Sequence, residues 1–421
     1  MATITTNLSV NNRSPDTPMV WSRSGILLGL VAAFLLAPKI SVVSVLRVED
    51  LVFLCALPVL LWRYVPSRTP VPGFMYWYVA YLALALLVSI FNIGHLGAYG
   101  VINVARQMQY VIWFFVGAQM ALHIPKERFR RILTGVAVVL VIWGIGEASW
   151  IIPKIGKFTG ASGRVTVNTS GPYEISVILV LLMLIVRNRL VLVSLALVLW
   201  LTQSRITLAA ALLTYLIFNW RKSVVFGLPV GVFLGGLLMV YPDIVSNSRL
   251  AETATPLQMW RAIAAQIETS PLITNLGDYR HYAYDTIWQT VDGTLDISFE
   301  IRVIRWALIL KSLGNDTIRL LFGWGPGAWG LAVDSHVVRL LGEVGLVGTA
   351  LMGMFVLRSI MSRSAPRPYR FGMCVVAICA VFIDVLTSSK IMSFLWVILG
   401  YYYARDTMDS TAERRMVQIP H

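Results

Sequence analysis

The sequence predicts an all-α polytopic membrane protein with about 12 transmembrane helices and one large extracytoplasmic loop that contains amphipathic helices. Three observations lead to this fold class. The chain is 57% hydrophobic and 13% charged, whereas a soluble domain carries about 25% charged residues. Its apolar residues form successive runs separated by short polar segments. A polar stretch of about 95 residues, Pro242 to His336, interrupts these runs once.

The apolar runs divide the chain into five parts. The first part of a transmembrane bundle occupies residues 24–241, the large loop residues 242–336, and the last part of the bundle residues 337–404. Polar tails, residues 1–23 and 405–421, flank them, and no cleavage site of a signal peptide follows the first run. The expected spans are 24–38, 51–62, 74–91, 101–122, 132–152, 172–186, 190–203, 206–219, 223–241, 337–357, 371–388 and 391–404.

Basic residues set the predicted orientation, because the cytoplasmic loops of membrane proteins are enriched in Lys and Arg. With both termini inside, the inner segments hold 19 of the 35 Lys and Arg residues but only five of the 21 Asp and Glu residues. That difference equals the formal net charge of +14. The positive charge therefore indicates topology and not nucleic-acid binding, and it places the large loop outside.

The large loop contains two segments with helical periodicity, residues 256–269 and 300–313. Both are expected to be amphipathic helices on the outer leaflet, and the second carries Arg302 and Arg305 three residues apart. The three cysteines and five histidines of the chain show no spacing typical of metal ligands. No metal or other cofactor is therefore expected.

Four places on the predicted outer side hold polar side chains beside the bilayer, where such groups are costly and often functional. They are the turn before residue 206, the loop 160–174, the outer end of the helix 101–122, and the large loop. The candidate binding and supporting residues there are Arg106, Arg164, Tyr173, Glu174, Ser204, Arg205, Arg302 and Arg305, and the large loop ends in the candidate catalytic residues Asp334 and His336.

The five arginines of this set are predicted to bind a diphosphate. A planar guanidinium bonds two phosphate oxygens at once and stays charged. Two alternatives remain open. Each arginine could instead pair with an acidic residue of the loop, and Arg205 could simply extend its charge to the membrane interface.

Two further features have more than one interpretation. The segment Gly323-Trp324-Gly325-Pro326-Gly327 looks like a nucleotide-binding loop, but no strand precedes it and no phosphate-binding helix follows it. A tight backbone turn that re-enters the membrane is expected instead. Asp384 lies inside a predicted span and is either a hydrogen-bonding residue between helices or a substrate contact.

The order of these elements resembles the O-antigen ligase and polymerase superfamily of bacterial polysaccharide assembly, over roughly residues 100 to 400. The resemblance is carried by a Ser-Arg pair that heads a helix, an arginine-bearing loop before a span, and a long loop that closes on a glycine turn and a glutamate. The matching residues are Gly163-Arg164 to Gly171-Pro172, Ser204-Arg205, Arg302-x-x-x-Trp306, Gly323 to Gly327, and Glu343-x-Gly345-x-x-Gly348.

One position departs from the ligase pattern. Ligases of the family carry a His-Asn pair nine residues before the glutamate that Glu343 matches, whereas this chain has Asp334-Ser335 there and His336 two residues later. An aspartate at this position resembles the polymerase branch. Asp334 is thus the first candidate for the proton acceptor, and His336 is the second because an imidazole titrates near neutrality. Asp334 could also be the N-cap of the following helix.

The resemblance implies metal-independent, inverting glycosyl transfer at the outer face of the bacterial inner membrane. The donor would be a glycan on undecaprenyl diphosphate. The acceptor would be a second lipid-linked repeat unit in a polymerase, or a lipid A core in a ligase. Membrane lipids would surround the protein, and a flippase and a chain-length regulator of the same pathway are expected partners.

A polytopic transporter or flippase is the alternative from a different class, because charges inside about 12 spans suit such proteins. Permeases of the major-facilitator type usually place their long loop at mid-chain in the cytoplasm, whereas this loop is late and predicted to be outside. This placement favours the enzyme over the transporter. A binding or scaffold role is the third alternative.

Overall fold

The computed structural model describes residues 23–40, 48–61, 71–154, 164–169, 171–219, 256–282, 297–330 and 333–417. In these ranges every regular element is helical, which confirms the all-α prediction. The principal helices are α1 (Arg23–Leu36), α2 (Val48–Leu61), α3 (Met75–Phe91), α4 (Ile93–Leu96), α5 (Tyr99–His123), α6 (Lys126–Ala148), α7 (Pro172–Met183), α8 (Arg189–Leu201), α9 (Arg205–Phe218), α12 (Pro256–Thr269), α13 (Leu276–Arg280), α15 (Ile297–Gly314), α16 (Thr317–Phe322), α17 (His336–Met361), α18 (Arg367–Ala380) and α19 (Ser389–Val417).

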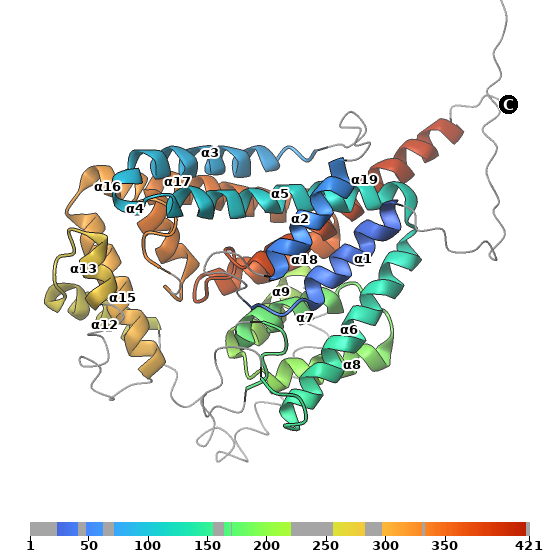
Figure 1. The fold of residues 1–421 in the computed structure, drawn as a ribbon, viewed down its shortest axis with the longest axis horizontal. Coiled ribbons are helices and arrows are strands. Elements are labelled where there is room, and N and C mark those ends of the chain that lie inside the picture. The colour runs from blue at the N-terminus through green and yellow to red at the C-terminus, as the bar shows by residue number, and fades with distance from the viewer. Residues whose placement is uncertain are drawn as a thin grey trace, which may run out of the picture.

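The helices form an elongated bundle with a second group of helices at one end (Figure 1). Helices α3, α5 and α17 run side by side along the bundle, and α5 also lies against α19. Helices α12, α13, α15 and α16 gather at one end, where α15 and α16 contact α17. The two regions have separate apolar cores, which meet beside α17.

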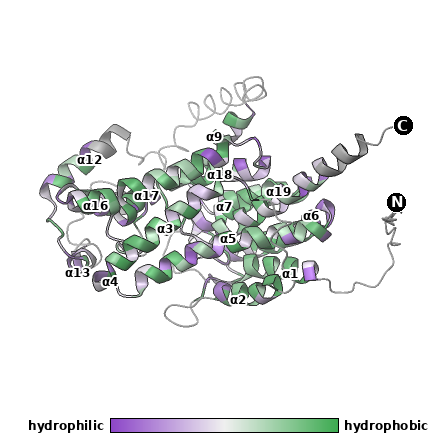
Figure 2. Ribbon diagram, turned by 90° about the horizontal axis from the view of Figure 1, so that it is seen from above, coloured by the Kyte–Doolittle hydropathy of each residue, from purple (hydrophilic) through white to green (hydrophobic). Residues whose placement is uncertain are grey.

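Among the described residues, two helices, α6 and α17, are long and apolar enough to cross a membrane. Five further apolar helices (α1, α3, α7, α8 and α9) are shorter, and Figure 2 shows hydrophobic residues along most of α1, α3 and α17. These helices support membrane association. The number of spans and their orientation stay predictions. The predicted span 223–241 lies outside the described residues, as do three parts of the large loop, residues 242–255, 283–296 and 331–332.

Helices α5 and α19 pack closely because each presents a glycine to the other. A Cβ atom at Gly117 would overlap the carbonyl oxygen of Val397, and one at Gly400 would overlap that of Phe114. Small residues at a crossing allow backbones to approach in this way, which is the usual packing device of membrane helices. This contact fixes α19 against α5 and so places the first turn of α19 near the middle of the bundle.

The two predicted amphipathic helices are present as α12 and α15, and the bounds of α12 equal the predicted ones. They pack against each other, and Ile263, Ile304 and Leu308 contribute to the apolar core of this end. The apolar face of each helix is thus buried in the protein. Whether the outer leaflet also contacts them stays a prediction.

The last part of the bundle differs from its predicted bounds. The predicted span 371–388 is wrong at its end, because α18 stops at Ala380 and the polar residues Asp384, Thr387 and Ser388 form a non-helical segment. The last helix, α19, continues beyond the predicted end of the final span at residue 404 and reaches Val417. Charge pairs favour the extension: Lys126 contacts Asp406 at 3.1 Å and Asp409 at 3.3 Å.

Helix α17, predicted as one span over 337–357, contains a break. Gly345 has φ 64° and ψ −166°, so the backbone leaves the helical conformation at this residue. The interruption frees carbonyl groups of the preceding turn, and the glycine segment 323–325 binds them. Trp324 N–H donates to Gly342 O at 2.9 Å, and Gly325 N–H donates to Glu343 O at 2.7 Å.

Candidate functional site

A polar cavity of about 140 Å³ lies where α5, α7, α17 and the segment before α19 meet. Five of the predicted site residues line it, although they come from distant parts of the chain: Arg106, Tyr173, Glu174, Asp334 and Glu343. The other lining residues are Lys39, Asp50, Tyr99, Asn103, Gln107, Tyr110, Gly327, Gly330, Arg339, Asp384, Val385, Thr387, Ser388, Ser389 and Ile391. The cavity is therefore the candidate functional site.

Asp334 is held between two cations at one wall of the cavity. Its Oδ2 lies 3.9 Å from Arg302 Nε and 3.8 Å from Arg305 Nη1, both on α15. These separations exceed hydrogen-bond length, so the two guanidinium groups act on the carboxylate through their charge. Burial raises the pKa of Asp334, and Arg302 opposes that rise. The side chain is 25% exposed, which leaves it accessible from the cavity.

His336 lies elsewhere. It is the first residue of α17, it is 2% exposed, and it is not among the residues that line the cavity. Ser335 is the N-cap of α17, because its side chain accepts a hydrogen bond from Val338 N–H at 3.4 Å. The alternative role of Asp334 as the helix cap is therefore wrong. The cavity wall thus presents Asp334 and not His336.

Arg339 joins two carboxylates at the same wall. Its guanidinium lies 3.0 Å from Asp384 Oδ2 and 3.5 Å from Glu343 Oε1, and the residue is 6% exposed. Glu343 is one helical turn away on α17, and Gly327 N–H also approaches its carboxylate. A buried carboxylate is unfavourable unless it is paired, and Arg339 pairs two of them. Asp384 both bonds to Arg339 of α17 and lines the cavity, so its position agrees with both alternatives, a hydrogen-bonding residue between helices and a substrate contact.

The glycine segment forms part of the cavity wall. Gly323, Gly325, Gly327 and Gly330 all have positive φ, between 73° and 101°. A Cβ atom at Gly323 would overlap the backbone of Glu343, and one at Gly327 would overlap the side chain of Asn103. The predicted tight turn is confirmed, and its physical reason is the close approach of this backbone to α17 and α5.

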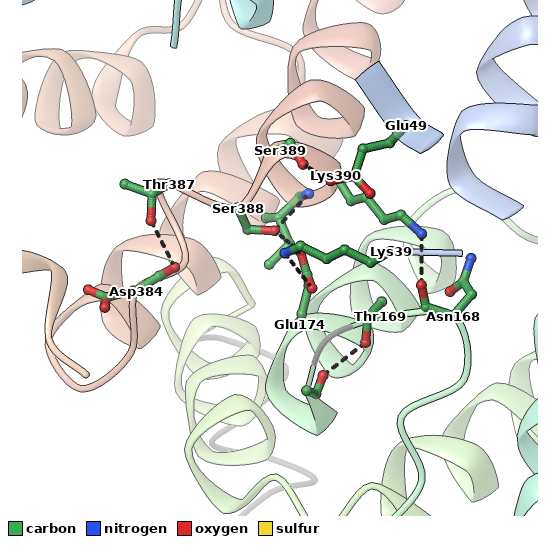
Figure 3. Close-up of polar contacts among 12 residues, drawn as sticks. Lys39, Glu49, Asn168, Thr169, Glu174, Asp384, Thr387, Ser388, Ser389 and Lys390 are labelled. Atoms are coloured by element: carbon green, nitrogen blue, oxygen red, sulfur yellow. Dashed lines mark hydrogen bonds and ion pairs between the residues drawn. The ribbon is translucent and has the colours of Figure 1, made fainter. Parts of the chain in front are cut away.

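The opposite end of the cavity contains a buried network around Glu174 (Figure 3). Lys39 Nζ lies 2.9 and 3.0 Å from the two carboxylate oxygens of Glu174, and Ser388 Oγ donates to the same carboxylate. Deeper in the network, Lys390 Nζ donates to Asn168 O at 3.0 Å and to Ala37 O, and Ser389 donates to Glu49 at 2.5 Å. Figure 3 shows how these side chains converge on the first turn of α19.

Arg106 lines the cavity from α5 and lies 3.8 Å from Asp50 Oδ2. Five carboxylates thus line the cavity, and each lies within ion-pair distance of at least one basic side chain. Only three of the lining residues are basic: Lys39, Arg106 and Arg339. Because these carboxylates are already paired with basic side chains, a neutral polar ligand suits the cavity better than a diphosphate does.

Arg164, Ser204 and Arg205 are placed at another site, the turn between α8 and α9. Arg164 donates to Thr202 O at 3.1 Å and to Gln203 O at 3.4 Å, while Ser204 Oγ lies 2.9 Å from Thr207 Oγ1. None of the three lines the cavity. The structure thus distributes the predicted arginines over three locations: this turn, the Asp334 wall and the Asp50 wall.

The loop 164–169 is held in place by Glu147 of α6. Its buried carboxylate accepts hydrogen bonds from Thr166 N–H at 3.1 Å, Thr166 Oγ1 at 2.8 Å and Val167 N–H. Val167 has φ 53°, and a β-branched residue in this conformation requires such support. Glu147 therefore has a structural role that accounts for a charge near the end of an apolar helix.

Sequence reasoning did not single out Lys39, Asp50, Arg339 or Lys390 as site residues. Arg339 and Lys390 carried a usable signal, because each is a charge inside or beside an apolar run. Lys39 and Asp50 lie at the ends of short runs and resemble ordinary flanking residues. In the described part of the chain, no group of three or more His, Cys, Asp or Glu side chains is placed to hold a metal ion.

Comparison of the chain with models of known protein families finds no match, and comparison with curated proteins finds none either.

Proposed function

We propose that this protein is a membrane polymerase that joins undecaprenyl-diphosphate-linked oligosaccharide repeat units into a surface or exported polysaccharide. The reaction is a metal-independent, inverting glycosyl transfer at the outer face of a bacterial inner membrane. The observation that supports it most is the convergence of Arg106, Tyr173, Glu174, Asp334 and Glu343 on one cavity. The sequence pattern predicts each of these residues as a site residue, and the folded chain brings them to one cavity.

In this mechanism the acceptor sugar occupies the cavity. Its walls offer uncharged hydrogen-bonding groups from Asn103, Gln107, Tyr110 and Thr387, together with the paired charges described above. Hydroxyl, amide and carboxylate groups match the donors and acceptors of a neutral sugar. The balanced ion pairs suit an uncharged ligand because it does not disturb the charges already neutralised there.

Asp334 is the proton acceptor. As the acceptor oxygen attacks the anomeric carbon of the donor, its proton passes to the Asp334 carboxylate and the bond from that carbon to the diphosphate oxygen breaks. Arg302 and Arg305 stabilise the diphosphate that leaves, since both carry a positive charge beside Asp334. The diphosphate is already an activated leaving group, so the step needs no nucleotide.

The direct test uses the purified protein in detergent with a synthetic undecaprenyl-diphosphate-linked oligosaccharide. A ladder of longer lipid-linked products, with release of one undecaprenyl diphosphate per bond formed, is the expected result. Addition of a lipid A core should leave the ladder unchanged if the protein is a polymerase. Transfer of the glycan to that core alone would instead identify a ligase.

One feature favours a second candidate function, a transporter or flippase. The break of α17 at Gly345 and the non-helical segment 381–388 both lie beside buried charges, and interrupted helices of this kind bind substrate in secondary transporters. Proteoliposomes with fluorescent lipid-linked oligosaccharide in both leaflets distinguish the functions. Movement between the leaflets without change in glycan length would support transport and contradict the polymerase.

A further inference from the structure

Asp384 has no role in the reaction proposed above, yet one oxygen of its carboxylate accepts three hydrogen bonds at the Asp334 wall. Oδ2 of Asp384 accepts hydrogen bonds from Val333 N–H at 3.0 Å, from Asp334 N–H at 3.1 Å and from Arg339 Nη2 at 3.0 Å. Two of these donors belong to the backbone that carries the proposed proton acceptor. The third, Arg339, is itself anchored to Glu343.

The backbone of Asp334 needs such support because it is in the left-handed region, with φ 59°. An aspartate adopts this conformation only at a cost in free energy, and surrounding contacts must maintain it. The adjacent Ser335 provides a second contact that fixes this backbone, because its hydroxyl donates a hydrogen bond to Val381 O at 2.8 Å. Asp384 and Val381, which make these two contacts, both belong to the segment after α18. This segment therefore sets the orientation of residue 334.

We propose that Asp384 is a positioning residue for Asp334: its carboxylate fixes the backbone of Val333 and Asp334 so that the Asp334 carboxylate faces the cavity. This inference rests on the proposed function, since it assigns Asp384 to the same reaction. Asp384 does not exchange a proton with substrate. It acts through the two N–H groups and through Arg339, which carries the same network to Glu343.

The charges around Asp334 also affect the pH dependence of the proposed reaction. The groups that face it are Arg302 and Arg305 of α15, Arg339 of α17, Tyr173 of α7 and Asp384 itself. Burial raises the pKa of Asp334 and the negative charge of Asp384 raises it further, whereas the three arginines lower it. Removal of that charge should therefore lower the pKa of Asp334 and extend activity to lower pH.

Two substitutions distinguish the positioning effect of Asp384 from the effect of its negative charge. Asp384→Ala removes the oxygen that accepts the backbone hydrogen bonds, while Asp384→Asn keeps an acceptor oxygen and removes only the charge. Asp406→Ala is the control, because Asp406 is half-exposed on the distant part of α19 and its partner Lys126 keeps Asp409. The measurements are kcat, KM and the pH profile of chain elongation, with protein yield and thermal unfolding in detergent as checks of folding.

Asp384→Ala should lower kcat by about 10²-fold with KM unchanged, the size typical of a misplaced catalytic group. Asp384→Asn should retain at least about a tenth of kcat, and its activity should persist to lower pH than that of the wild type. An alanine variant with wild-type kcat overturns the inference. It is also overturned if the asparagine variant folds but is as inactive as the alanine variant, or if its pH profile is unshifted.

These outcomes differ from a failure of the proposed function. If the wild-type protein elongates the lipid-linked oligosaccharide, the variants test Asp384 alone. If the wild-type protein makes no polymer, the proposed function fails first, and the assignment of Asp384 fails with it.

Discussion

At the residue scale, the site is a set of buried charges that neutralise one another. Lys39 pairs with Glu174, Arg106 with Asp50, and Arg339 with both Glu343 and Asp384. Removal of one side chain of such a pair leaves the other charge buried and uncompensated, which destabilises the protein by about 3–5 kcal/mol. Substitutions at these positions therefore test stability as much as function, and the informative variants are those that keep the charge or the shape.

Asp334→Asn is the most direct test of the proton acceptor. We expect kcat for chain elongation to fall by about 10²- to 10⁴-fold, because the amide cannot accept the proton. Protein yield should stay normal, since Asn tolerates positive φ and Ser335 caps α17 without help from residue 334. His336→Ala should keep most of the activity. Full activity of Asp334→Asn with none in His336→Ala would transfer the role to the histidine.

The pH profile gives an independent measurement of the same group. Burial raises the pKa of Asp334 above that of an ordinary aspartate. A general base works only when it is deprotonated, so activity should be lost as the pH falls through this raised pKa. The acid limb of kcat should thus lie above the pH at which an exposed aspartate titrates, and Asp334→Asn should remove the limb. An acid limb that is unchanged in this variant would show that another group titrates.

Arginine-to-lysine substitutions test the contacts to the diphosphate. Arg302→Lys and Arg305→Lys keep the charge beside Asp334 but lose the planar fork, so kcat should fall strongly at normal protein yield. Arg164→Lys is the matched comparison at the turn between α8 and α9. A loss there with none at Arg302 and Arg305 would move the diphosphate site to that turn.

At the element scale, helix breaks shape the cavity. Helix α17 is interrupted at Gly345, and the glycine segment 323–325 binds the carbonyls that the break exposes. The chain between α18 and α19 is non-helical over residues 381–388, and this places Asp384, Thr387 and Ser388 at the cavity. Continuous helices would pair these backbone groups internally and leave no polar wall.

Gly345→Ala should show the importance of the break. The new Cβ would overlap the backbone at Leu321, and alanine at positive φ costs about 1–2 kcal/mol before any clash is counted. Both the thermal unfolding temperature and the elongation rate should fall. Gly353→Ala in the same helix is the control, because a Cβ there meets no atom within 4 Å. Equal behaviour of the two variants would mean that the break is unimportant.

At the scale of the whole molecule, topology determines which side of the membrane the cavity serves. In a cysteine-free background, Asp278→Cys and Asn315→Cys place exposed thiols on the group of short helices, and Ser364→Cys places one before α18. An impermeant thiol reagent applied from the periplasmic side should label the first two in intact cells and the third only after lysis. The reverse pattern would invert the orientation and place the site in the cytoplasm.

The sequence by itself determined the all-α class, the positions of most helices and the amphipathic helices at 256–269 and 300–313. These properties follow from local periodicity and composition, which each segment carries without reference to the rest of the chain. The sequence alone did not predict where α18 and α19 end. Asp384 and Ser388 interrupt a helix only because distant residues bond to them. Arg339 forms an ion pair with Asp384, and Glu174 accepts a hydrogen bond from Ser388.

Only the tertiary structure decided which candidates share a site. It placed Asp334 at the cavity and His336 in the interior, separated Arg164 and Arg205 from Arg302 and Arg305, and added Arg339 and Lys39. The physical reason is that these choices depend on long-range contacts. Gly345 must meet residues 321–322, Gly400 must meet Phe114, and Asp384 must meet the backbone of Asp334 before the cavity exists.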